Sequence, residues 1–212
     1  MPVDQIFKLP PGEIIYLRKQ YEESALTRWF TDHRDRRVFS FILPEYKRIV
    51  DIGCGEGITL EKMVKVYAGK EVSGIDAEEE NISICRSLGL PVQQGSVYDL
   101  HFDEGSVDCC TMTDVIEHLD EPERVLRELS RVLRGKGRLI IVFPHDRLFT
   151  LARLLTFKFK QAFYFPGHVR QWTPGSMARA LEAAGFRIQA RENIPFGLWA
   201  FSLYHLVVAE KK

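Results

Sequence analysis

The sequence predicts an α/β fold in which helices cover both faces of a doubly wound, mostly parallel sheet. Two observations support this prediction. From residue 48 onward, short apolar runs alternate with segments of helical periodicity, which is typical of a parallel sheet covered on both faces. Three glycines, Gly53, Gly55 and Gly57, follow the first run and precede a helical segment. Because 212 residues can bury one sizeable core, we expect a single domain.

Seven apolar runs are expected to be strands. They are residues 48–52, 71–75, 92–93, 107–112, 138–143, 186–191 and 203–209. Helices are predicted after the glycines, over about 77–88, from residue 120 to the glycines at 135 and 137, and from Thr173 to Gly185. In the helix that begins near residue 120, Asp120 is the expected N-cap and Pro122 lies in the first turn.

Residues 14–42 carry apolar side chains at helical spacing among many charges. This pattern predicts two amphipathic helices that end near Pro44, ahead of the sheet. Three aromatic side chains of this segment, Tyr16, Tyr21 and Trp29, are expected to help complete a pocket.

Composition excludes some classes of partner. The 29 basic and 29 acidic residues cancel, so no overall field draws the chain toward nucleic acid, and we expect no nucleic-acid partner. The four cysteines show neither a paired framework nor the spacing of metal ligands, which fits a reducing cytosol. Neither a secretory signal nor an apolar stretch of roughly 20 residues is found. We therefore expect a cytoplasmic protein.

The glycine turn is placed to hold a ligand. Between a strand and a helix, missing side chains let backbone N–H groups approach a bound molecule closely. A dinucleotide-binding turn normally reads G-x-G-x-x-G, but here the third glycine comes one residue early and Ile58 takes its place. The spacing therefore disfavours a nicotinamide cofactor.

Charge around the turn points the same way. Asp51, Glu56 and Asp76 bring three carboxylates to the strand ends, and no lysine or arginine stands within the turn. A ligand that carries positive charge fits these acids better than a pyrophosphate does. Asp76 closes the second strand, where its side chain can accept hydrogen bonds from both ribose hydroxyls of a nucleoside. The alternative is a purely structural turn with Asp76 as a helix cap, and the two roles can coexist.

Four segments, in order, resemble motifs of the class I S-adenosylmethionine-dependent methyltransferases, and in particular the type 11-like group. They are residues 50–57, 74–76, 95–100 and 113–119, within a resemblance that spans 48–187. The chain is also similar, less specifically, to quinone-biosynthesis methyltransferases. The resemblance implies a Rossmann-like, seven-stranded sheet with an antiparallel last strand, S-adenosylmethionine as the cofactor and S-adenosylhomocysteine as its product.

The resemblance also assigns roles to individual residues. Gly53 and Gly55 pass beside the methionine part of the cofactor, Asp51 orders the turn or the ammonium group, and Asp76 holds the ribose. Where the family often has an acid or amide that reads the adenine amino group, this chain has Ser96. That contact then passes to the main chain of Val97 or to water. The full set is Asp51, Gly53, Cys54, Gly55, Gly57, Asp76, Ala77, Ser96, Val97 and Thr113.

Methyl transfer is an in-line displacement, so the protein aligns the nucleophile, excludes water and removes a proton only when the acceptor holds one. The candidate bases are His118, His145 and His168, since imidazole titrates near neutral pH. His145, directly after the fifth strand, has the better position, and the alternative is a plain loop residue.

Asp114, Glu117 and His118 lie within one turn and offer oxygen and nitrogen ligands to a divalent metal. The alternative is a short helix capped by Asp114, with no metal. We expect no metal here.

The segment 147–165 is both apolar and basic. Three interpretations stay open: a lid over an apolar acceptor, an amphipathic segment in peripheral contact with a membrane, or a helix pair packed on the core. Together with the resemblance, this segment favours a small-molecule or lipid-like acceptor. We expect one methyltransferase domain over 1–212, with a helical preface (1–46), a cofactor-binding core (47–145), an insertion (146–170) and C-terminal helix and strands (171–212).

Three functions compete on these grounds. A methyltransferase is favoured over a non-catalytic nucleoside-binding regulatory protein of the same fold, and an NAD-dependent oxidoreductase ranks last. The sequence leaves the acceptor, the methylated atom, which can be oxygen, nitrogen or carbon, and the oligomeric state open.

Overall fold

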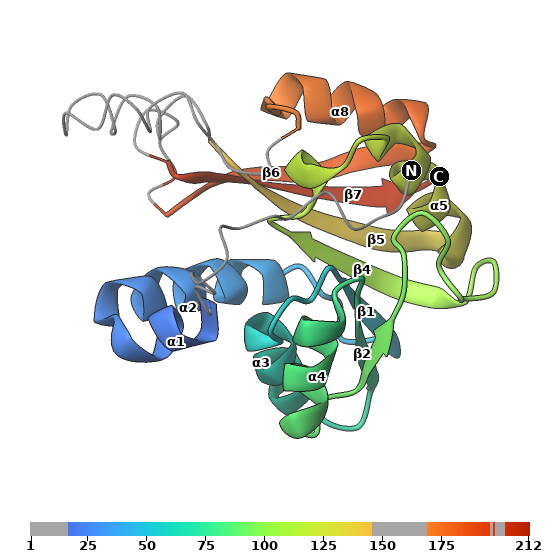
Figure 1. The fold of residues 1–212 in the computed structure, drawn as a ribbon. Helices are drawn as coiled ribbons and strands as arrows, with labels where there is room; N and C mark the ends of the chain where they lie inside the picture. The colour runs from blue at the N-terminus through green and yellow to red at the C-terminus, as the bar shows by residue number, and fades with distance from the viewer. Residues whose placement is uncertain (1–16, 146–168, 196, 198–201) are drawn as a thin grey trace.

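The computed structural model describes residues 17–145, 169–195, 197 and 202–212. Figure 1 shows its elements, which in chain order are α1 (Leu17–Glu23), α2 (Ala25–Phe39), β1 (Arg48–Ile52), α3 (Ile58–Val66), β2 (Glu71–Asp76), α4 (Glu79–Ser87), β3 (Val92–Gln94), β4 (Val107–Thr113), the 3-10 turn η2 (Ile116–His118), α5 (Pro122–Val132), β5 (Leu133–Pro144), α8 (Pro174–Ala183), β6 (Phe186–Ile194) and β7 (Tyr204–Lys211). The predicted segment 147–165, His168 and Tyr16 lie outside the described residues.

The strands form one sheet of seven, in the order β3-β2-β1-β4-β5-β7-β6. Pairing is parallel from β3 through β5, whereas β7 runs antiparallel to both β5 and β6. The chain starts in the middle at β1, winds outward to β3 and returns to β4 on the other side. The predicted fold class, a Rossmann-like doubly wound sheet with an antiparallel last strand, is confirmed.

Helices cover both faces of this sheet. In Figure 1, α2, α3 and α4 lie on one side and α5 and α8 on the other. Neighbouring residues of β1 belong to the apolar clusters on opposite faces. Ile49 lies in the cluster with Val38 of α2 and Met63 of α3, whereas Val50 lies in the cluster with Leu126 of α5. Successive side chains of a strand point to opposite faces, so a central strand must be apolar throughout.

The helix after β4 begins one residue later than expected. Glu121, not Asp120, occupies the N-cap position of α5, and its side chain makes no capping hydrogen bond. Pro122 takes the first helical position instead. Proline is well suited there because its fixed φ is helical and a donor at N1 has no partner within the helix. The start of α5 is therefore set by proline rather than by an acidic cap.

The glycines at 135 and 137 have a different role from the predicted one. Helix α5 ends at Val132 and β5 begins at Leu133, so both glycines lie inside the strand, where pairing with β4 shifts register. A Cβ on Gly137 would lie 2.9 Å from the carbonyl oxygen of Arg134 and 3.0 Å from that of Asp108. Glycine here permits a close backbone approach at a bulge.

The two expected N-terminal helices are present as α1 and α2. The side chain of Ser24 caps α2 by accepting a hydrogen bond from the Thr27 amide at 3.2 Å. Thr173 likewise caps α8, in a reciprocal capping box with Ser176, so this helix begins where the sequence predicts. Over the described ranges, no helix is both long and apolar enough to cross a membrane.

Candidate functional site

The glycine turn lies at the carboxyl edge of the sheet, where β1 passes into α3. The amides of Gly53 and Cys54 donate to the carbonyl of Ile75 at 2.8 and 3.0 Å. These two bonds tie the turn to the end of β2. Ligands of open α/β sheets bind at this edge, next to the point where the winding reverses, which here lies between β1 and β4.

Two glycines of the turn are required for different reasons. Gly53 (φ 68°) and Gly55 (φ 53°) both adopt left-handed backbone conformations that side chains disfavour. A Cβ on Gly53 would lie 2.4 Å from Cγ2 of Val115, so the protein itself fills that space. A Cβ on Gly55 would meet no atom of the described residues within 4 Å. Beside Gly55, therefore, the backbone borders space that a ligand can take.

Asp76, at the end of β2, holds the turn and the next helix together. One carboxylate oxygen accepts from the Gly55 amide at 2.8 Å. The other accepts from the Glu78 amide at 3.0 Å and the Asn81 side chain at 3.1 Å. A carboxylate has about four acceptor positions, so capacity is left for a hydroxyl of a ligand. Both roles expected for Asp76 are thus compatible with this geometry.

Asp51 is the other buried acid of the site, with 3% of its surface exposed. Thr111, on the neighbouring strand β4, donates its hydroxyl to the carboxylate at 2.6 Å. Burial raises the pKa of Asp51 to about 7, although the bond from Thr111 opposes the shift. A positively charged ligand group beside this carboxyl would favour its ionised form.

Thr113 lies two residues beyond Thr111, where β4 ends. Its hydroxyl oxygen is buried and has no hydrogen-bond partner among the described residues. Buried polar atoms normally have partners, so this hydroxyl and the open space at Gly55 fit a polar ligand at the edge. These groups fit S-adenosylmethionine: buried carboxyl groups, backbone amides of glycines and a hydroxyl without a partner among the described residues. The turn itself contains no lysine or arginine.

The residues predicted to face the adenine come together at the ends of β2 and β3. The Gly95 amide donates to the carbonyl of Asp76 at 3.0 Å, which places Ser96 near Ala77. Ala77 and Ser96 are exposed, and Val97 is half-buried against the core on the α5 side. The Ser96 hydroxyl accepts from the Tyr98 amide at 3.2 Å and keeps its own proton for donation.

Glu56 has a different role from the expected free carboxylate. Its two oxygens accept from the amides of Leu17 and Arg18 at 2.8 and 2.9 Å, at the start of α1. The Arg18 guanidinium in turn donates to the Glu56 carbonyl and, at 2.8 Å, to Glu61. The turn therefore has an arginine beside it, delivered by a helix 38 residues away in sequence.

Arg34 of α2 is a second residue that the sequence does not single out. It donates to Asp114, just after β4, at 2.9 Å, and to Thr59 of α3 at 3.0 Å. It also bonds to Asp35, which is almost completely buried and accepts from Lys62 at 2.7 Å. Asp114 has a left-handed backbone (φ 56°). Arg34 thus fixes the loop after β4 to the helical preface.

His145 follows β5 directly and is buried, with 5% of its surface exposed. Its Nδ1 lies 3.1 Å from the carbonyl oxygen of Ser202. A carbonyl only accepts, so Nδ1 is the donor, and the neutral ring carries its lone pair on Nε2. The ring centroid lies 4.7 Å from that of His205, a residue not predicted from sequence. Burial, and to a lesser extent His145, lowers the pKa of His205 to about 4.

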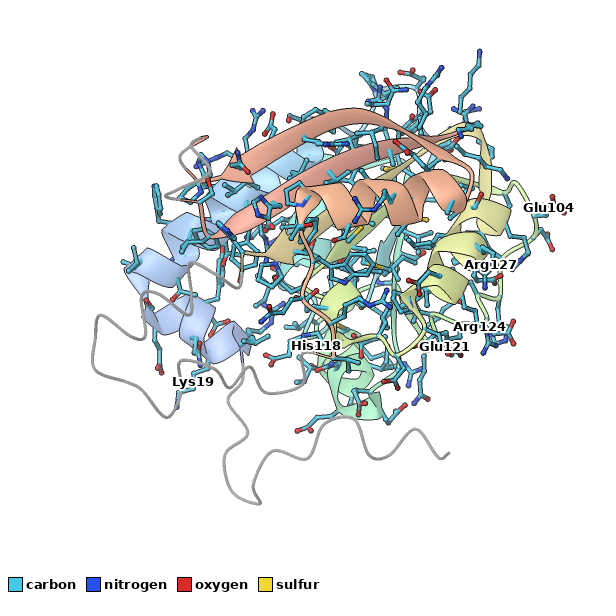
Figure 2. The ribbon with its side chains drawn as sticks, turned by 90° about the horizontal axis from the view of Figure 1, so that it is seen from above. Lys19, Glu104, His118, Glu121, Arg124 and Arg127 are labelled. Atoms are coloured by element: carbon cyan, nitrogen blue, oxygen red, sulfur yellow. The ribbon has the colours of Figure 1, made fainter. Side chains whose placement is uncertain are left out.

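His118 ends the η2 turn and is partly exposed, ahead of Glu121 at the start of α5 (Figure 2). The adjacent carboxylate of Glu117 is buried, 4.0 Å from the His118 ring nitrogen. Asp114 accepts a hydrogen bond from Arg34 at 2.9 Å. Within the described ranges, no group of three or more potential ligand side chains is arranged for a metal.

Two of the three aromatic side chains expected to help complete a pocket lie in the described helices α1 and α2. The Tyr21 hydroxyl donates to Asp32 at 2.8 Å within the helical pair. Trp29 stacks on His33 of its own helix, with ring centroids 5.8 Å apart. Their part in a pocket stays a prediction.

Comparison with known proteins assigns this arrangement. Residues 50–141 match a family model described as a methyltransferase domain. The matched segment runs from β1 into β5 and contains the glycine turn and Asp76. The resemblance read from the four sequence motifs is therefore confirmed.

Curated relatives point to the same class of protein. The chain is 29% identical over 162 residues to a probable S-adenosylmethionine-dependent methyltransferase of Mycobacterium tuberculosis, covering 74% of this chain and 55% of that protein. It is 32% identical over 101 residues to a ubiquinone biosynthesis O-methyltransferase of Xanthomonas oryzae, covering 44% and 41%. The chain spans about half the length of these curated relatives.

Solved structures share the fold. A methyltransferase from Archaeoglobus fulgidus described as SAM-dependent superposes with a TM-score of 0.73 at 18% identity, over 94% of this chain and all of that one (100%). The [4+2]-cyclase SpnF superposes with a TM-score of 0.66 at 18% identity, over 85% and 80%. Similar folds therefore occur in proteins whose described activities differ, so the site residues must carry the functional argument.

Proposed function

We propose that the chain is a methyltransferase that takes a methyl group from S-adenosylmethionine and transfers it to a small-molecule or lipid-like acceptor. The observation that carries the proposal is the glycine turn at the carboxyl edge. There, Gly55 borders open space and donates its amide to Asp76. The methyltransferase family match over residues 50–141 supports the same reading.

Ten residues would hold the cofactor in this proposal. Asp51 and Thr113 line the end that takes the methionine part, with the turn formed by Gly53, Cys54, Gly55 and Gly57. Asp76 would hold the ribose, and Ala77, Ser96 and Val97 would lie along the adenine. When bound, the cofactor supplies an electrophilic methyl group on a positively charged sulfur. The chain's own contribution is to orient that group and exclude water.

A base is needed only if the acceptor atom carries a proton. His145 is our first candidate, because the carbonyl of Ser202 fixes its ring with Nε2 as the basic nitrogen. His118 is the second candidate, from the turn that follows β4. Both residues follow strands at the edge where the glycine turn lies.

The acceptor class rests on sequence and on the positions of two chain segments. The amide of His145, where β5 ends, donates to the backbone carbonyl of Leu203 at 2.8 Å, and the amide of Val169 donates to the backbone carbonyl of Glu117 at 2.9 Å. Both flanks of the apolar and basic insertion are therefore anchored beside the site. A small or lipid-like acceptor, a cytoplasmic location and a peripheral membrane contact through 147–165 belong to the proposal. The name of the ubiquinone-pathway relative is consistent with it.

A non-catalytic nucleoside-binding protein is the alternative. A cyclase shares the fold at a TM-score of 0.66, so the fold by itself does not require methyl transfer. Such a protein would bind the cofactor through the same residues and transfer nothing. An NAD-dependent enzyme fits less well, because the third glycine precedes the position that a dinucleotide turn requires.

Calorimetry with S-adenosylhomocysteine and NAD on the full chain tests the proposal. We expect binding of the first and none of the second. Asp76→Asn should weaken the affinity for S-adenosylhomocysteine by about tenfold or more, since a charged acceptor is lost. Asp103→Ala, an exposed acid in the loop before β4, should leave the affinity unchanged. A chain that binds neither donor nor product would overturn the proposal.

Transfer itself is tested separately. The chain is incubated with methyl-labelled S-adenosylmethionine and with metabolite and lipid extracts, and the label is followed into each fraction. Label in the lipid or small-molecule fraction supports the enzyme. Cofactor binding with no labelled product in any fraction would favour the non-catalytic alternative.

A further inference from the structure

A hollow of about 430 Å³ lies between α2 and the outermost strand, β6. Helix α2 contributes His33 and Arg37 to its lining. The rest of the lining comes from residues 191–195, at the end of β6, and from Gly197. None of these residues belongs to the glycine turn or to the candidate bases.

The hollow follows the open edge of the sheet. Strand β6 is last in the strand order, so one of its edges pairs with no other strand among the described residues. Successive side chains of a strand alternate between faces, so a hollow lined by five consecutive residues lies along the edge itself. Edge strands present unpaired backbone N–H groups, which add hydrogen-bond donors to the lining.

Charge in the hollow is positive on balance. The Arg37 guanidinium donates through Nε to the Glu192 carboxylate at 2.8 Å and through a second nitrogen to its other oxygen. Arg191 is exposed, and within the described residues its side chain makes neither an ion pair nor a hydrogen bond. Two arginines against one glutamate leave an excess of one positive charge, before His33 is counted.

We propose that this hollow binds an oxyanion, the phosphate or carboxylate group of a small molecule. A guanidinium offers paired N–H donors whose fork matches two oxygens of such a group. Arg191, which has no partner among the described residues, can make that contact, and His33 and the edge amides can add to it. Glu192 holds Arg37 in place, and its negative charge keeps the affinity low.

The site is separate from the cofactor site. Strand β6 lies four places from β1 in the sheet order, which at the usual strand spacing is roughly 19 Å. The inference does not rest on the proposed methyl transfer, because it requires neither the cofactor nor an acceptor. Saturation with S-adenosylhomocysteine should therefore leave oxyanion binding unchanged.

Binding is measured by NMR titration of the full chain with inorganic phosphate and, in a second arm, with acetate. We expect saturable chemical-shift changes of the Gly197 and Asn193 amides. The probe that binds more tightly, phosphate or acetate, shows which oxyanion group the hollow prefers. Arg191→Gln should weaken binding by about fivefold or more, as a charge-assisted contact is lost. Arg187→Gln is the matched control. It removes the same charge from the same strand, but Arg187 pairs with Glu210 at 2.8 Å, outside the hollow.

A second pair of variants tests whether removing a negative charge from the hollow strengthens oxyanion binding. Glu192→Gln removes the competing carboxylate and frees Arg37, so oxyanion binding should strengthen by about threefold or more. Glu210→Gln changes the charge equally outside the hollow and should have no effect. If Arg187→Gln and Arg191→Gln weakened oxyanion binding equally, or if Glu192→Gln did not strengthen it, the binding would be explained by the overall charge of the surface. Either result would overturn the proposal.

Discussion

Asp51 shows how one buried carboxyl links the fold to pH. Its pKa is raised to about 7 by burial, whereas a carboxyl in an unfolded chain titrates near about 4. Between these values the folded protein binds more protons than the unfolded one. Its free energy of unfolding therefore falls as pH rises through this window.

Asp51→Asn should remove this pH-dependent decrease in the free energy of unfolding. The amide oxygen can still accept from Thr111, which donates to Asp51 at 2.6 Å, but it has no proton to lose. Without ligand, urea unfolding at pH 4, 6 and 8 should show the variant gaining on the natural protein as pH rises, by up to about 4 kcal/mol. The two pH profiles would run parallel if Asp51 were already ionised at pH 4.

Gly53 and Gly55 separate stability from binding. Alanine at either position adopts a left-handed conformation at a cost of about 1–2 kcal/mol. At Gly53 the new Cβ also meets Val115 at 2.4 Å, so Gly53→Ala should lose a further 1–3 kcal/mol or so. At Gly55 the Cβ enters open space, so the fold should persist while S-adenosylhomocysteine affinity falls. Thermal melts and calorimetry on both variants give the comparison, and equal melting temperatures would contradict it.

At the scale of elements, α2 is attached to the site by Arg34. This one side chain joins Asp35 and Thr59 to Asp114, at the end of β4. Burial alone would lower the pKa of Arg34, but the carboxylates of Asp35 and Asp114 outweigh that effect and raise it. The guanidinium is therefore fully charged in the fold.

Arg34→Met should destabilise the chain by about 3 kcal/mol, because the buried Asp35 carboxylate loses one of its two cationic partners and keeps only Lys62. Cofactor affinity should also fall, since the loop after β4 loses its anchor. Arg36→Met, on the exposed side of the same helix, should change the free energy of unfolding by less than about 0.5 kcal/mol. Urea unfolding measures both, and similar losses would contradict the role given to Arg34.

For the whole molecule, ligand binding should appear as added stability. Only the folded sheet brings β1, β2 and β4 together at one edge, so S-adenosylhomocysteine should bind only the folded chain. At about 100 times its dissociation constant it should add roughly 2.7 kcal/mol, which for a domain of this size raises the melting temperature by about 5–10 °C. NAD should give no shift. With Asp76→Asn, the same concentration of S-adenosylhomocysteine should add roughly 1.4 kcal/mol or less, about half of the original shift, because the affinity is about tenfold weaker.

Local pattern was enough to predict the elements and their class. The strands β1, β2 and β4 carry apolar residues on both faces because helices cover both faces of the sheet, so they can be recognised without knowing their partner strands. The glycine turn and Asp76 were found because such a turn needs bare backbone after a strand. The start of α5 was misplaced by one residue, since acid and proline signals overlap there.

The sequence by itself determined the fold class, the glycine turn and the acids beside it, because these depend on residue type and short spacing. Only the tertiary structure decided that Glu56 caps α1, that Arg34 holds Asp114, that the His205 ring lies against His145 and that charges gather beside β6. Those contacts join segments far apart in the chain, such as Arg37 and Glu192, 155 residues apart. No local periodicity encodes which side chains meet, since that depends on how the sheet is wound and how the helices pack on it.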